Sequence, residues 1–309
     1  MAFDRLIKKI IEMKNPTVVG LDPKLSYIPD YITKYCFDKY GETLEGAAEA
    51  FLEFNKCIID EICDIVPAIK PQCAYYEALG WQGMRVLEET ISYAKSCGMF
   101  VITDGKRNDI GSTMEMYAVA HLGKNKIENN EYEPFGADAL TVNGYLGTDT
   151  ISPLAQICKD EDKGMFVLVK TSNKSSGELQ DRILDSGEEI YKAMGKMCEN
   201  WGEESRGEFG YSAVGAVVGA TYPTQLSEMR AEMPHTFILV PGYGAQGGTA
   251  KDVAGAFDNR GLGAIINSSR GILTAWQKKG MDEMDFAKGA REAAIEMRED
   301  ITSVIGEIK

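Results

Sequence analysis

Eight short runs of aliphatic and β-branched residues recur along the chain, and each ends in a polar or glycine-bearing turn. The runs span residues 17–21, 66–69, 99–103, 139–142, 165–170, 213–219, 236–240 and 263–267. Most are almost continuously apolar, which is typical of strands covered on both faces. Stretches of helical periodicity separate them, among others at residues 44–63, 83–97, 112–129 and 186–204. This alternation predicts βαβ units and a parallel sheet.

The number of these units favours one fold over its main alternative. Eight units within 309 residues indicate an α/β fold of the (β/α)8 TIM barrel type, and an open doubly wound sheet is the alternative. No internal repeat, low-complexity tract or Pro/Ser-rich linker interrupts the chain. We therefore expect a single barrel domain over residues 1–309, with an insertion after the first strand at about residues 26–41.

Charge and cysteine usage limit the class of protein. The chain has 33 Lys and Arg against 47 Asp and Glu, a net charge of −14, which argues against nucleic-acid binding. Its longest apolar run, residues 213–220, is far shorter than the roughly 20 residues that span a bilayer, and no signal-peptide pattern is present. Seven scattered cysteines without a C-x-x-C pair indicate reduced thiols rather than disulfides or zinc. We expect a cytoplasmic protein without a membrane partner.

Charged residues follow the first three predicted strands, where apolar core would otherwise continue. They are Asp22, Lys70, and Asp104 with Lys106. A solvated loop explains any one of them, but catalysis in a barrel takes place at these carboxyl ends of the strands. Asp104 and Lys106 are two residues apart on an extended strand, so we expect them to face the mouth together, beside Lys70. Such a Lys–Asp–Lys array keeps each group charged, whether it serves catalysis or is a structural ion-pair network.

The segment after the third strand resembles a known active-site motif. Asp104-x-Lys106-x-x-Asp109-Ile110-x-x-Thr113 is similar to the signature of the orotidine 5′-phosphate decarboxylase family. Five further segments agree with this family in order and spacing: Gly20-Leu21-Asp22-Pro23, Ile69-Lys70-Pro71-Gln72, Lys170-Thr171-Ser172-Asn173, Pro241-Gly242-Tyr243-Gly244-Ala245-Gln246-Gly247-Gly248 and Asn267-Ser268-Ser269-Arg270-Gly271. The length and the long insertion resemble the larger bacterial subtype. Gly105 stands where alanine is commoner, which removes no functional group.

The resemblance implies a function and a role for each matching residue. The reaction is decarboxylation of orotidine 5′-monophosphate (OMP) to UMP and CO2, the last step of UMP synthesis, by a homodimer without a metal or organic cofactor. The implied catalytic residues are Lys70, Asp104, Lys106 as proton donor to C6, and Asp109 from the neighbouring subunit. The implied substrate-binding residues are Asp22, Lys70 and the partner's Thr113 for the ribose, Ile110, Ser172 for the pyrimidine edge, and Gln246 and Arg270 for the phosphate.

The chemistry of this reaction suits those residue types. Loss of CO2 from C6 leaves a carbanion without an adjacent electron sink, and a preorganised ammonium such as Lys106 stabilises that charge and then delivers a proton. A carboxylate at Asp104 beside the substrate carboxylate raises the energy of the bound substrate. The two histidines, His121 and His235, lie within a predicted helix and before a strand, and we expect them to be bystanders.

Gly242-x-Gly244-x-x-Gly247 also matches the dinucleotide-binding fingerprint. That fingerprint normally follows the first strand, whereas these glycines follow the seventh. A phosphate-binding loop at strands seven and eight of a barrel fits the position better, with backbone N–H groups, a helix N-terminus and Arg270 receiving the anion.

Two rival functions remain open at this point. One is a phosphate-binding barrel that acts on a sugar phosphate through a magnesium-stabilised enediolate, which needs an acidic ligand near the second strand. Lys70-Pro71-Gln72 offers none. The other is a barrel that only binds nucleotide, which would not need the Lys70–Asp104–Lys106 array.

Overall fold

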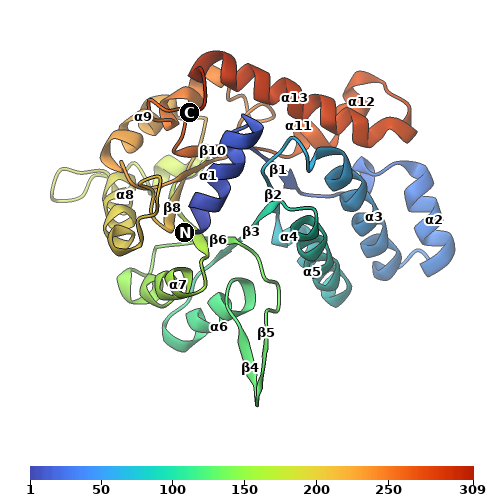
Figure 1. Cartoon of the computed structure of the whole chain (residues 1–309), viewed down its shortest axis with the longest axis horizontal. Helices are drawn as coiled ribbons and strands as arrows, with labels where there is room; N and C mark the ends of the chain where they lie inside the picture. Colours follow the sequence, from blue (N-terminus) through green and yellow to red (C-terminus); the bar gives the residue numbers. More distant parts are fainter.

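Eight parallel strands close into a barrel in the computed structural model, which describes residues 1–309 (Figure 1). The barrel strands are β1 (Thr17–Leu21), β2 (Ala68–Pro71), β3 (Phe100–Arg107), β6 (Ala139–Val142), β7 (Gly164–Lys170), β8 (Val214–Val218), β9 (Ile238–Val240) and β10 (Ala264–Ser268). They follow one another around the barrel in the order β1-β2-β3-β6-β7-β8-β9-β10, and β10 pairs with β1. The predicted TIM barrel is therefore confirmed, and the open-sheet alternative is wrong.

Helices surround the barrel and bury the outer face of its strands (Figure 1). The longer ones are α2 (Asp30–Tyr40), α3 (Leu44–Ile62), α5 (Gly80–Ser96), α6 (Gly111–His121), α7 (Thr148–Asp160), α8 (Ile190–Trp201), α9 (Pro223–Glu232) and α13 (Phe286–Ile305). The short ones are α4 (Cys73–Glu77), α10 (Ala250–Val253), α11 (Arg270–Leu273) and α12 (Ala275–Lys279). The predicted insertion, residues 26–41, contains α2, which packs against α3.

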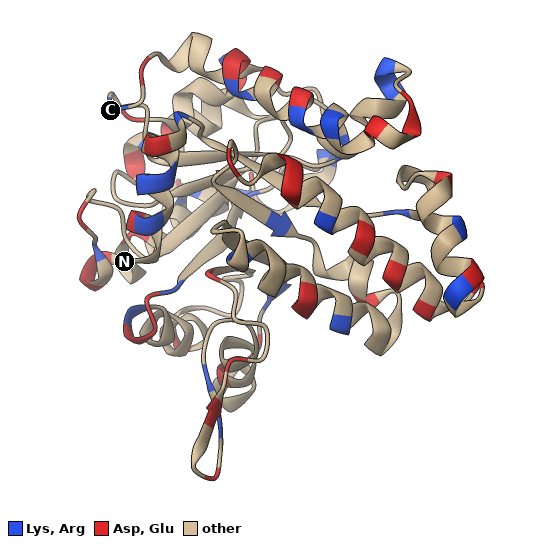
Figure 2. Cartoon of the chain, turned by 45° about the vertical axis from the view of Figure 1, so that its right-hand side comes forward, with Lys and Arg blue, Asp and Glu red and all other residues tan.

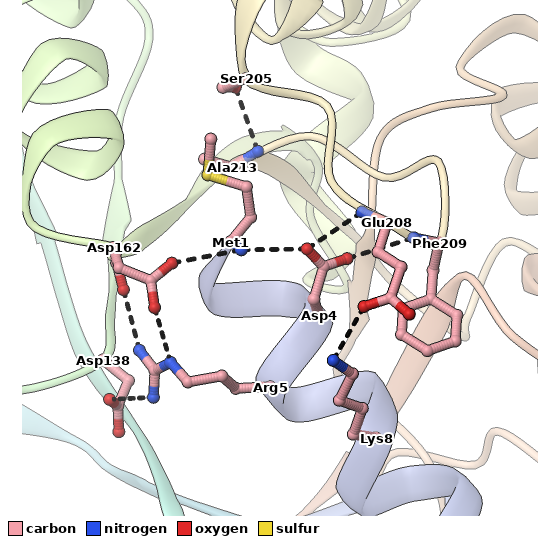
Figure 3. Close-up of polar contacts among 10 residues, drawn as sticks. All are labelled: Met1, Asp4, Arg5, Lys8, Asp138, Asp162, Ser205, Glu208, Phe209 and Ala213. Atoms are coloured by element: carbon pink, nitrogen blue, oxygen red, sulfur yellow. Dashed lines mark hydrogen bonds and ion pairs between the residues drawn. The ribbon is translucent and has the colours of Figure 1, made fainter.

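The first helix, α1 (Ala2–Met13), closes the end of the barrel at which the strands begin. The Phe3 ring lies 4.9 Å from that of Phe166 and 5.3 Å from that of Phe237. Polar contacts hold α1 in this position (Figure 3). Arg5 pairs with Asp138 at 2.9 Å, and Asp4 accepts hydrogen bonds from the backbone N–H groups of residues 208 and 209. With one end of the barrel filled, only the opposite end, where the strands finish, is open to a ligand.

Two predicted helices are too long, and the stretch expected at residues 186–204 is an α-helix only over Ile190–Trp201. The stretch expected at residues 112–129 ends as a helix at His121, so His121 lies at a helix end rather than within one. An antiparallel hairpin, β4 (Asn125–Ile127) and β5 (Asn130–Tyr132), follows and projects from the barrel (Figure 1). All six of its strand residues are exposed, so no buried face continues the helical pattern, and Glu128 takes the positive φ of 53° that the tight turn requires.

Charged residues lie mainly on the outer helices, where both signs alternate, and the barrel strands are nearly free of them (Figure 2). None of the helices has both the length and the apolar character that a membrane span requires. The few charges on barrel strands therefore stand out, and most of them gather at one end.

Candidate active site

A cavity of about 620 Å³ opens at the carboxyl ends of the strands. Seven of the ten site residues predicted from the sequence line it: Asp22, Lys70, Asp104, Lys106, Ser172, Gln246 and Arg270. They come from the ends of six strands that are spread over the whole sequence. The closed parallel barrel brings them together because all its strands end on the same side.

Asp104 is the centre of the charge array at the base of this cavity. One of its oxygens, Oδ2, accepts from Lys70 Nζ at 2.6 Å and from Gln72 Nε2 at 2.9 Å. The other, Oδ1, accepts from Lys106 Nζ at 2.6 Å and from Thr141 Oγ1 at 2.7 Å. Four donors therefore fix the carboxylate in one orientation, and the predicted Lys–Asp–Lys array exists.

Burial and charge act against each other in this array. The side chains of Lys70 and Asp104 are only 5% and 9% exposed. Burial by itself lowers the pKa of Lys70, but attraction to Asp104 and Asp22 outweighs it, so the pKa is raised. Burial likewise opposes ionisation of Asp104, yet Lys70 and Lys106 hold the pKa of that carboxyl well below its ordinary range. Both groups therefore stay charged at neutral pH.

Lys106 reaches Asp104 by a different local geometry from the one expected. The pairing of β3 with β6 shifts register between Thr103 and Arg107, so the strand bulges there rather than continuing in extended form. Lys106 has φ of +48°, a left-handed conformation that is uncommon outside glycine, and its backbone N–H donates to Thr141 Oγ1 at 3.0 Å. The bulge turns the side chain into the cavity, where it remains 46% exposed and free to meet a ligand.

Two buried oxygen atoms near the array, Asp22 Oδ1 and Asn267 Oδ1, have no hydrogen-bond partner within the protein. Both residues line the cavity. Buried polar atoms normally find partners. These two acceptors therefore suit a ligand that carries hydroxyl groups.

The loop after β9 forms one wall of the cavity. Gly242, Gly244 and Gly247 all have positive φ, at 104°, 69° and 96°, which explains why glycine stands at these three positions. Arg270 donates to the carbonyl of Ala245 at 3.0 Å, which places its guanidinium beside this loop. Because Arg270 and Gln246 are both cavity residues, the wall offers a fork of N–H donors to an anion.

Comparison with known proteins identifies the family. Residues 18–280 match the model of the orotidine 5′-phosphate decarboxylase / HUMPS family. The chain belongs to this family. A relative from Rhodopirellula baltica, named orotidine 5′-phosphate decarboxylase, is 44% identical over 296 residues, which cover 94% of this chain and 96% of the relative. One of the same name from Clostridium tetani is 40% identical and covers 99% of both chains. The chain is therefore a decarboxylase, a carboxy-lyase.

Solved structures agree with this assignment. A crystal structure of a Streptomyces avermitilis protein superposes with a TM-score of 0.77 at 31% identity, covering 98% of this chain and 95% of that one. The structure of Leishmania donovani OMP decarboxylase gives 0.73 at 28% identity, with 98% of both chains covered. The length of the chain also agrees with the larger subtype of the orotidine 5′-phosphate decarboxylase family.

Three predicted site residues lie outside the cavity of their own chain: Asp109, Ile110 and Thr113. They lie just before or within the first turn of α6, where Ile110 is 62% exposed and Thr113 is exposed as well. Asp109 Oδ1 accepts the backbone N–H of Ile110 at 2.7 Å. This half of the family motif therefore does not line the cavity that holds the Lys70–Asp104–Lys106 array.

Two contacts of Asp104 were missed in the sequence. Gln72 belongs to a segment that matched the family, but no role was assigned to it, and Thr141 lies on β6 without any motif. Gln72 could have been found from its spacing, because it lies two positions after Lys70 and residues two apart on an extended strand point to the same side. No sequence signal pointed to Thr141, because its contact depends on the register between β3 and β6. No three His, Cys, Asp or Glu side chains form a group that could hold a metal ion.

Proposed function

We propose that the chain decarboxylates OMP to UMP and CO2 directly, through a C6 carbanion that Lys106 protonates, without a metal ion or organic cofactor. Decarboxylation of OMP in UMP synthesis follows from membership of the family. The observation that carries the direct route is the Asp104 carboxylate held at 2.6 Å by two ammonium groups at the base of the cavity.

The charge array supplies a positive charge for the electron pair that develops on C6 in the transition state. As the bond from C6 to the carboxylate breaks, an electron pair is left on C6, and the exposed part of the Lys106 ammonium stabilises it. The proton then passes from Lys106 Nζ to C6, which gives UMP. Asp104, fixed by four donors, cannot turn away from the substrate carboxylate, so their repulsion is relieved as CO2 departs.

The rest of the cavity suits the rest of the nucleotide. The unpaired acceptor of Asp22 and the ammonium of Lys70 would hold ribose hydroxyls, and Ser172 would contact the pyrimidine edge. Gln246 and Arg270 would bind the phosphate on the glycine-containing wall.

A second copy of the chain would complete this site. Asp109, Ile110 and Thr113 lie outside their own cavity, so a two-fold partner could present them to the neighbouring one. Large apolar side chains are exposed on the same side, in the segments that follow the adjacent strands β2, β3 and β6: Trp81, Ile110, Met116, Tyr145 and Leu146. An isologous dimer would bury this surface.

The proposal extends to organisation and location. The chain would form one barrel domain in which residues 26–41 are an insertion. A cytoplasmic location is supported by the seven cysteines, all of which are free.

The activity is tested by mixing the purified protein with OMP and following the fall in absorbance as the pyrimidine loses its carboxylate. We expect that decay to persist unchanged after dialysis against EDTA, because ammonium groups rather than a metal would stabilise the carbanion. Decay that disappears with EDTA and returns with Mg2+ would favour the magnesium-dependent rival.

Arg270→Ala is expected to lower kcat/KM for OMP by several orders of magnitude without a comparable loss of stability. Phosphate binding energy is used at the reacting centre, and Arg270 is an exposed bidentate donor at the cavity wall. The measurement is kcat/KM for OMP and for orotidine, which lacks the phosphate.

The matched control is Arg206→Ala, which removes another exposed arginine from outside the cavity. Its kinetics should remain those of the wild type. If Arg270→Ala reduces turnover of orotidine as severely as turnover of OMP, Arg270 has a structural role and the phosphate site lies elsewhere.

A further inference from the structure

The segment between β7 and α8, residues 171–189, borders the cavity but has almost no hydrophobic anchor. It carries Ser172 and Asn173, which line the cavity. Ser176 is its only buried residue. Its large apolar side chains face solvent: Leu179, Ile183 and Leu184. Polar contacts must therefore hold this segment in place.

The strongest of these contacts starts at a buried lysine that the proposed chemistry does not use. Lys170, the last residue of β7, has a fully buried side chain, and it is not part of the cavity wall. Its Nζ donates to Asp181 Oδ1 at 2.6 Å and lies 4.4 Å from the centre of the Tyr222 ring. Gln225 Nε2 donates to the same oxygen of Asp181 at 3.2 Å.

We propose that Lys170 is a positioning residue, whose ion pair with Asp181 holds the 171–189 segment so that Ser172 faces the substrate. A buried ammonium without a partner is costly, so the segment is stable only where it brings Asp181 to Lys170. The aromatic face of Tyr222 adds a cation–π contact from the other side. The Lys170 ammonium is therefore stabilised only when Asp181 and Tyr222 are both in place, and this requirement fixes the conformation of the 171–189 segment.

A chain of hydrogen bonds links this ion pair to Ser172. Gln180, next to Asp181, accepts the backbone N–H of Thr171 at 2.9 Å and donates to its Oγ1 at 2.8 Å. The backbone carbonyl of Ser172 accepts from Thr221 at 3.1 Å, one residue before Tyr222. Gln180, next to Asp181, thus holds Thr171, and Thr221, next to the Tyr222 ring that packs on Lys170, holds Ser172.

The kinetic test compares two buried lysines at opposite ends of the same strand. Lys170→Met should lower kcat/KM for OMP by about a hundredfold, the size of effect expected when a substrate contact is misplaced by about 1 Å. Lys163→Met is the matched control, since Lys163 is buried just before β7 and lies outside the cavity. It should retain wild-type kinetics. Asp181→Asn should act like Lys170→Met on kcat/KM. If either single variant fails to fold, the double variant Lys170→Met/Asp181→Asn gives the kinetic test instead, because it leaves no buried charge unpaired.

A double-mutant cycle separates positioning from a general loss of stability. Once Ser172→Ala has removed the contact, adding Lys170→Met should lower kcat/KM by no more than about twofold further. A full hundredfold loss in that background, or a Lys170→Met enzyme as active as Lys163→Met, would overturn the inference. The ion-pair double variant Lys170→Met/Asp181→Asn should regain stability relative to Asp181→Asn without regaining activity, because no buried charge is then left unpaired.

The kinetic arm rests on the proposed function, so a second readout is independent of it. Amide hydrogen exchange of the ligand-free protein should be faster at residues 171–189 in Lys170→Met and Asp181→Asn, and unchanged there in Lys163→Met. If the wild-type protein does not decarboxylate OMP, the proposed function is refuted and the positioning role is not. Unchanged exchange in both Lys170→Met and Asp181→Asn would refute the positioning role alone.

Discussion

Lys106→Ala is expected to abolish turnover of OMP while the barrel stays folded. The ammonium is asked both to stabilise the C6 carbanion and to protonate it, and together these contributions amount to at least about ten-thousand-fold. Folding should survive because Asp104 keeps three other donors: Lys70, Gln72 and Thr141. The measurements are the rate of absorbance decay with OMP and the midpoint of thermal unfolding.

A matched control is available on the outer surface. Lys159 on α7 has a side chain 44% exposed, close to the 46% of Lys106, and it also pairs with a carboxylate, that of Glu204. Lys159→Ala should leave turnover unchanged. If Lys106→Ala retains turnover within about tenfold of wild type, Lys106 is not the proton donor and the proposed mechanism is wrong.

The central part of the site could be predicted from the sequence because a parallel barrel converts order along the chain into proximity. Asp22, Lys70 and Asp104 each follow a separate apolar run, and the strand ends of a barrel meet at one mouth. The left-handed backbone conformation of Lys106 could not be predicted in this way. Periodicity assumes a regular strand, whereas the bulge between Thr103 and Arg107 is set by pairing with β6.

Other features depend on tertiary contacts that leave no local pattern. Thr141 meets Asp104 only through the register of two strands, and the β4–β5 hairpin replaces the end of a predicted helix because no buried face lies there. Lys170 was noted only as part of a family segment, since nothing in the sequence indicates that Asp181, eleven residues later, returns to it. From the sequence, a charged residue at the end of a strand could equally line the cavity, as Lys70 does, or hold a neighbouring segment in place, as we propose for Lys170.

The motif residues outside the cavity lead to the second large effect, which concerns how the active site is assembled. Lys106 and Asp109 are three residues apart, yet only Lys106 lines the cavity of its own chain. If Asp109 serves the partner's site, two inactive variants can complement each other. Lys106→Ala and Asp109→Ala, unfolded together in equal amounts and refolded, should give mixed dimers as about half of the population.

Each mixed dimer then has one site with both lesions and one with neither, so activity should return to about a quarter of the wild-type value. The matched control mixes Lys106→Ala with Asp104→Ala. Both of those residues line their own chain's cavity, so every site in such a mixed dimer keeps one lesion and activity stays absent. Mixed dimers of Lys106→Ala and Asp109→Ala that are demonstrated by mass but remain inactive would show that Asp109 acts in its own chain. In that case α6 would have to move toward the cavity on binding substrate, because in the free chain Asp109 lies outside it.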